Sequence, residues 1–164
     1  MQRTNVMKLK IFLLMSFQDK IMLFINFILC GLVYVLNNIF NYQHLSRYFG
    51  NDYPMLAASI PISKLQVSQA VRIRRSVCLV ARYTPWNSNC LVQAMVALIW
   101  CKYYKIPYLL FIGFAKKSEK PLGKDAHAWV TAGPIAITGG QSFDSHLIVY
   151  TFSNRTLTMG KIRK

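Results

Sequence analysis

Carboxylates are the scarcest side chains in this sequence. The 164 residues include 20 lysines and arginines but only five acidic residues, which gives a formal net charge of +15 at pH 7. The acids are Asp19, Asp52, Glu119, Asp125 and Asp144. Because proteins bind Mg²⁺ and Ca²⁺ mainly through carboxylate oxygens, this shortage nearly excludes a site for either ion.

Other signatures of metal and nucleotide binding are also missing. The four cysteines are Cys30, Cys78, Cys90 and Cys101. They contain neither the closely spaced pairs of structural zinc sites nor the compact spacing of a disulfide framework. No glycine-rich phosphate-binding loop is present. We therefore expect no metal and no cofactor, and the cysteine pattern indicates a reducing compartment such as the cytoplasm.

The length of 164 residues suits one domain with a modest core. The short stretch 50–54 is the candidate linker, since no repeat or low-complexity tract divides the chain. We expect a hydrophobic helical region over residues 1–50 and a core over residues 51–164, packed as one compact unit.

Residues 21–40 form an uncharged apolar run, IMLFINFILCGLVYVLNNIF. Its length just meets the requirement of about 20 residues for a membrane span. Asn26, Asn37 and Asn38 weaken a spanning assignment, and no small-x-small cleavage site of a signal peptide follows the run. Three interpretations remain: a buried core helix, a helix lying on the inner face of the membrane, and a true span.

Cys90 stands where a predicted helix begins. Residues 85–89, PWNSN, are turn and N-cap types, and helix-forming sequence continues from Cys90 to Tyr104. The unpaired N–H groups and the dipole of a first helical turn favour a thiolate over a thiol. A helical cysteine alone is more often a small buried hydrophobic residue, so a catalytic role needs a partner.

His127 is the candidate partner. Residues 108–115 are apolar and aromatic and predict a buried strand, residues 116–124 predict an exposed loop, and residues 126–131 predict a second strand that carries His127. A turn at 132–134 leads to a third short strand at 135–138. If the hairpin is centred between Ala132 and Gly133, opposite residues have numbers that sum to about 265, and His127 faces Thr138. A core histidine with a satisfied hydrogen bond is the competing interpretation.

The remaining pattern completes an α+β fold. Residues 41–49 and 63–80 predict helices, the second with a capping box formed by Ser63 and Gln66. Residues 147–152 predict a further strand, and we interpret His44 and His146 as structural. We expect N-terminal helices, then a cysteine-bearing helix packed on a small antiparallel sheet. This layout is typical of papain-like and transglutaminase-like cysteine enzymes, in which an imidazole is the base for a thiol.

The motifs also resemble a family, the transglutaminase-like leader peptidases of bacterial lasso peptide biosynthesis, which are the protease half of the B protein. The resemblance rests on Trp86-x3-Cys90-Leu91, Ile106-Pro107, Ile112-Gly113 and Ala126-His127-Ala128-Trp129-Val130. It extends upstream through the helix at residues 66–81 to the apolar N-terminal segment, so it covers most of the chain. It implies that Cys90 is the nucleophile and His127 the general base, and it favours a buried core helix at residues 21–40.

The third catalytic residue departs from the family pattern. The resemblance places an aspartate on the strand after the histidine, near Thr138 or Gly139, and neither is an acid. Asp144 is the one carboxylate after His127, so it is the candidate third residue, although it also suits a surface turn. Thr138 or a backbone carbonyl is the alternative group to orient the imidazole. Loss of a charged orienting group costs rate without abolishing the cysteine–histidine pair.

The resemblance implies a cysteine peptidase that removes the leader from a ribosomally made lasso precursor peptide. It further implies a separate small leader-binding protein that presents the precursor and a separate ATP-dependent cyclase that receives the product. The alternative is a non-catalytic basic scaffold that binds a peptide, a membrane surface or nucleic acid, since a net charge of +15 favours anionic partners. Nucleic acid is disfavoured because the basic residues are scattered and no nucleic-acid-binding motif is present.

Overall fold

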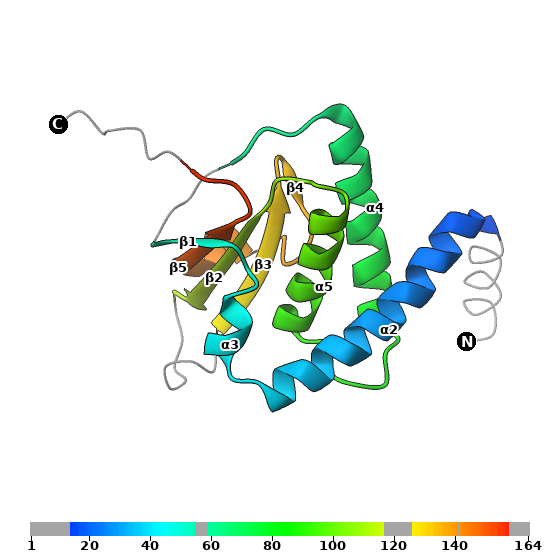
Figure 1. Ribbon diagram of the computed structural model, residues 1–164, viewed down its shortest axis with the longest axis horizontal. Helices are drawn as coiled ribbons and strands as arrows, with labels where there is room; N and C mark the ends of the chain where they lie inside the picture. The colour runs from blue at the N-terminus through cyan, green and yellow to red at the C-terminus, as the bar shows by residue number, and fades with distance from the viewer. Residues whose placement is uncertain (1–13, 55–58, 117–125, 141, 158–164) are drawn as a thin grey trace.

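The computed structural model describes residues 14–54, 59–116, 126–140 and 142–157. These residues form an α+β fold in which helices pack on a five-stranded sheet with the order β1-β5-β2-β3-β4 (Figure 1). Each strand pairing in the sheet is antiparallel. The elements are α2 (Phe17–Ile39), α3 (Tyr42–Ser46), β1 (Asn51–Pro54), α4 (Lys64–Ala81), α5 (Cys90–Tyr103), β2 (Leu109–Ala115), β3 (Ala126–Ala132), β4 (Ile135–Ala136), α6 (Ser142–Ser145) and β5 (His146–Ser153). The expected fold class is therefore confirmed.

The two sheet faces carry different clusters. The main core lies between the sheet and helices α2, α4 and α5, and it includes Leu110, Ile112, Ala128 and Val130 from the strands. The opposite face carries a smaller cluster of Leu109, Phe111 and Trp129, packed with Ile60, Ile148 and Leu157. Because side chains alternate along a strand, each residue of β3 belongs to one face only.

Helix α4 confirms the predicted capping box. The hydroxyl of Ser63 accepts a hydrogen bond from the backbone N–H of Gln66, and the backbone N–H of Ser63 donates to the side chain of Gln66. The Gln66 amide also donates to the carbonyl of Lys105, which follows α5. The start of α4 is thus fixed near the end of the cysteine-bearing helix.

Helix α2 crosses the outside of α4 and α5 (Figure 1). It buries one stripe formed by Met22, Asn26, Cys30 and Val33. The α2 outer face consists of its exposed large apolar side chains: Phe17, Ile21, Phe24, Ile25, Phe27, Ile28, Leu32, Val35, Leu36 and Ile39. Among the described helices, α2 alone is long and apolar enough to cross a membrane, judged by length and composition. It is neither a wholly buried core helix nor a helix free of the domain.

The structure corrects two local predictions. The helix expected over residues 41–49 covers only Tyr42–Ser46. The expected linker at 50–54 instead forms β1, which pairs with β5 at the sheet edge. That pairing joins segments far apart in the sequence, so local sequence does not reveal it.

Candidate active site

The loop that precedes Cys90 is held by its own side chains and by α2. The hydroxyls of Thr84 and Ser88 form a 2.8 Å hydrogen bond, and the side-chain amide of Gln93 donates to the carbonyl of Ser88 at 2.8 Å. The ring of Trp86 packs on α2, with its centroid 4.9 Å from that of Phe27. A Cβ at Gly31 would lie 3.1 Å from the same indole, so glycine permits this close approach.

The capped start of α5 leaves two backbone N–H donors beside Cys90 without a partner among the described residues. The Asn89 side chain accepts from the N–H of Val92 at 3.0 Å, and the carbonyl of Asn89 accepts from the N–H of Gln93 at 3.0 Å. The N–H groups of Cys90 and Leu91 have no hydrogen-bond partner within the described residues. These are the donors that the first turn of a helix leaves open to an anion. The expected placement of Cys90 in the first turn is confirmed, and its side chain is half-buried.

Cys90 and His127 lie at the same end of the domain. Helix α5 packs on β3, and the short connection after its last turn leads directly into β2. Since β2 is antiparallel to β3, helix α5 and β3 run in the same direction, so both begin at one end of the sheet (Figure 1). Cys90 is the first residue of α5 and His127 the second of β3.

The two side chains nevertheless belong to opposite faces of the sheet. His127 is opposite Gly113 in the β2–β3 pairing, and it alternates with Ala128, which packs in the core under α5. The imidazole therefore shares its face with Trp129, whose ring it stacks on at a centroid distance of 5.9 Å. No hydrogen bond joins Cys90 to His127 in the described part of the chain, so the structure brings the two residues to one end but not into contact.

The neighbour of His127 is His146. Their ring centroids are 5.1 Å apart, and Nδ1 of His146 lies 2.8 Å from the hydroxyl of Ser145. Burial lowers the pKa of His127 below its ordinary value of 6.5, and the charge of His146 lowers this pKa further. No local sequence signal points to this pair, because its contact depends on a register shift between β2 and β5 at Ile112 and Gly113.

The expected contact between His127 and Thr138 is wrong. In the hairpin Thr131 pairs with Ala136, and Ala132 pairs with Ile135. The numbers of opposite residues therefore sum to 267, two more than predicted. The Thr138 hydroxyl instead accepts a hydrogen bond from the backbone N–H of Val130 at 3.1 Å. The β4 strand ends at Ala136, too early to reach His127.

Asp144 lies in α6, directly before β5. In the sheet, β2 separates β5 from β3, the strand that carries His127. Its backbone carbonyl accepts a hydrogen bond from Nζ of Lys116 at 3.0 Å, and its side chain is exposed. Within the described ranges, no hydrogen bond or ion pair joins its carboxylate to His127. The structure therefore supplies no contact between the candidate third residue and the imidazole.

The described residues contain no group of three or more histidine, cysteine or acidic side chains placed to hold a metal ion. All four cysteines are free thiols. Burial raises the pKa of Cys101 to about 12 and also raises that of Cys30. Cys30 and Cys101 are buried in the core, whereas Cys78 and Cys90 are half-buried.

A protein-family model matches the part of the chain that contains both candidate residues. Residues 51–149 match the model of the transglutaminase-like superfamily, so the matched region begins with β1 and includes both Cys90 and His127. No curated protein and no solved structure matches the chain.

Proposed function

Because this chain belongs to the transglutaminase-like superfamily, we propose that it is a cysteine peptidase that removes the leader from a ribosomally made lasso precursor peptide. One observation carries the proposal: the half-buried Cys90 begins a capped helix whose first two N–H groups are unpaired within the described residues. That arrangement provides a nucleophile and, directly beside it, donors for the oxyanion of an acyl-transfer reaction.

In the proposed reaction, Sγ of Cys90 attacks the scissile carbonyl carbon. The carbonyl oxygen becomes an oxyanion, which the N–H groups of Cys90 and Leu91 stabilise. His127 takes the thiol proton and returns it to the leaving amine as the peptide bond breaks. Water, with His127 again as the base, then hydrolyses the thioester to release the second product and regenerate the thiol.

This reaction requires the imidazole to leave its place beside Trp129 and turn toward α5. His127 is near the start of β3, where only Ala126 precedes it in the strand. A rotation of residues 126–127 would move the ring while the rest of the β2–β3 pairing is kept. The β3 residues on either side of His127 are alanines, Ala126 and Ala128, so the incoming ring meets small side chains. We propose that the bound precursor favours this turned state.

Asp144 remains the candidate group to orient the turned imidazole, because the chain has no other carboxylate after His127. The proposed partners are the precursor peptide, a small leader-binding protein and an ATP-dependent cyclase. A gene neighbourhood with a short precursor frame beside a cyclase gene would support this set of partners.

The test is cleavage of that precursor peptide in the presence of the leader-binding protein. We expect Cys90→Ala to abolish cleavage and retain peptide binding, and His127→Gln to slow cleavage by about a hundredfold to ten-thousandfold. His44→Gln, in α3, is the matched control and should cleave as the unaltered protein does. Asp144→Asn should lower the rate if this carboxylate orients the ring.

A non-catalytic peptide-binding scaffold is the second candidate. The observation that favours it is the placement of His127 on the sheet face away from Cys90. A Cys90→Ala protein that still supports precursor processing would establish the scaffold and overturn the peptidase. Full cleavage by His127→Gln would instead remove this histidine as the base.

A further inference from the structure

The α2 outer face is unusual for a soluble domain surface. Nearly half of the exposed large hydrophobic residues in the described chain belong to this one helix, and Phe24 and Leu32 are 66% and 56% exposed. Isolated exposed apolar residues are ordinary, but a continuous row along a helix indicates an interaction surface. Most of the row lies opposite the buried stripe of α2. At its margins Phe27 packs on Trp86, and Ile21, Ile25 and Leu36 border hollows next to α5.

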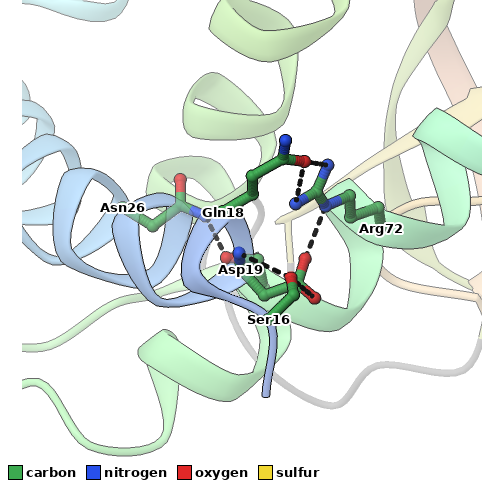
Figure 2. Close-up of polar contacts among 6 residues, drawn as sticks. Ser16, Gln18, Asp19, Asn26 and Arg72 are labelled. Atoms are coloured by element: carbon green, nitrogen blue, oxygen red, sulfur yellow. Dashed lines mark hydrogen bonds and ion pairs between the residues drawn. The ribbon is translucent and has the colours of Figure 1, made fainter.

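The opposite side of α2 is fixed to the protein by buried polar contacts. Asn26 is fully buried, donates to the hydroxyl of Ser76 in α4 at 2.6 Å and accepts from Nε1 of Trp100 in α5 at 2.6 Å. At the start of the helix, the carboxylate of Asp19 pairs with Arg72 of α4 (Figure 2). A span surrounded by lipid would break these contacts and leave the Asn26 amide unpaired in hydrocarbon. We therefore infer that α2 stays docked on the domain.

Basic side chains border the apolar surface near the end of α2. A cavity of about 770 Å³ lies between α2, α3 and α5. Its walls include Leu36 and Phe40, both partly exposed, and it is also lined by Arg47 and Lys102. Between Asp19 and Asp52 the sequence contains no carboxylate, so no acidic residue of this segment offsets these charges.

We propose that the α2 outer face, together with Arg47 and Lys102, docks the folded domain on the surface of an anionic phospholipid bilayer. The apolar side chains enter the boundary between headgroups and acyl chains, with α2 parallel to the membrane, and the basic side chains contact lipid phosphates. A symmetric dimer through the same face is disfavoured, because it would oppose like charges from two chains that each carry +15.

The test is flotation of the full-length protein with lipid vesicles. One set is phosphatidylcholine alone and the other an equal mixture of phosphatidylcholine and phosphatidylglycerol. We expect binding to the anionic vesicles that weakens with salt. The double variant Phe24→Ser/Leu32→Ser should lower the partition coefficient about tenfold or more, since it removes two large apolar side chains from the interface. Arg47→Gln should lower it about fivefold.

A matched control removes two apolar side chains of similar exposure elsewhere. Leu65 and Leu147 are 68% and 60% exposed, on α4 and β5. The variant Leu65→Ser/Leu147→Ser should bind as the unaltered protein does, and thermal unfolding of both double variants checks that each is folded.

Four results would overturn the proposal. The first two are no flotation of the unaltered protein and equal flotation of both double variants. The third is resistance of the bound protein to extraction by alkaline carbonate, which would show that α2 spans the membrane. The fourth is a lipid-free dimer that Phe24→Ser/Leu32→Ser dissociates, which would show that a second copy of the chain covers the α2 outer face. The docking proposal is independent of catalysis, because Cys90→Ala should bind vesicles normally whatever its effect on cleavage.

Discussion

The imidazole rings of His127 and His146 lie 5.1 Å apart on the sheet face that α5 does not cover. Partial burial disfavours the protonated form of His127, and the nearby charge of His146 disfavours it further. The ring proposed as a general base is therefore neutral at pH 7, since its pKa is lowered from 6.5.

We predict that His146→Gln raises the pKa of His127 but leaves it below 6.5, because burial is the larger cause of the shift. NMR titration of the carbon-bound protons of the His127 imidazole would measure this change in pKa. An unchanged His127 titration would show that the two rings do not interact.

The same shift predicts how folding stability depends on pH. The unfolded chain protonates His127 at about 6.5, whereas the folded chain does so only at lower pH. Stability contributed by the neutral ring is therefore present above 6.5 and is lost as pH falls from there to the folded pKa. The variant His127→Gln should lose less stability across this window in urea unfolding, and a slope equal to that of the unaltered protein would contradict the shift.

Asn26→Ala should lower the free energy of unfolding by about 2–4 kcal/mol, because it leaves the Trp100 indole and the Ser76 hydroxyl buried without their shared partner. The control is Asn38→Ala, which removes an exposed amide that donates to the Tyr34 carbonyl on the same helix. The control should change stability by about 0.5 kcal/mol or less. Equal urea midpoints for both variants would rule out a structural role for the buried amide.

Gly113→Ala should destabilise the sheet by about 1–3 kcal/mol. A Cβ at this position would lie 2.5 Å from the backbone oxygen of Leu147 and 2.9 Å from the ring of Trp129. Gly140→Ala is the control, since its Cβ would meet only the Ala136 methyl, at 3.3 Å. Thermal unfolding would compare the stabilities of the Gly113→Ala and Gly140→Ala proteins. A Gly113→Ala protein as stable as the control would contradict the β2–β5 register.

Asn89→Ala should cost about 1 kcal/mol, because it removes the side-chain cap on the N–H of Val92 at the start of the cysteine-bearing helix. Asn41 occupies the same position before α3 but makes no side-chain cap hydrogen bond. Asn41→Ala should therefore have a smaller effect in the same unfolding measurement. Comparable losses would mean that the cap does not hold α5.

The sequence was informative where local signals agree. The cap at Asn89 and the continuous helix formers predicted the start of α5 at Cys90, and the apolar run predicted β2. The same reasoning missed β1, because its four residues include Asp52 and Pro54, types that are depleted in strands. That strand exists because β5 offers it a partner from the far end of the chain.

Alternation along β3 did not by itself predict which sheet face carries His127. Alternation shows that His127 and Trp129 share a face, but it does not say which face meets the helix. The structure places small Ala128 under α5, where Ala94 and Ala97 are also buried, and directs the large indole to the other side. The size contrast between alternate residues of β3 was the available signal, and it favours close helix packing on the alanine side.

The position of β5 has a consequence for how the chain acquires its structure. β5 is the last described strand in sequence, yet it lies between β1 and β2 in the sheet. A nascent chain that has not yet reached His146 therefore leaves β1 and one edge of β2 without their partner. Completion of the sheet must await the emergence of these late residues from the ribosome, so the open edge of β2 is available for incorrect pairing until then.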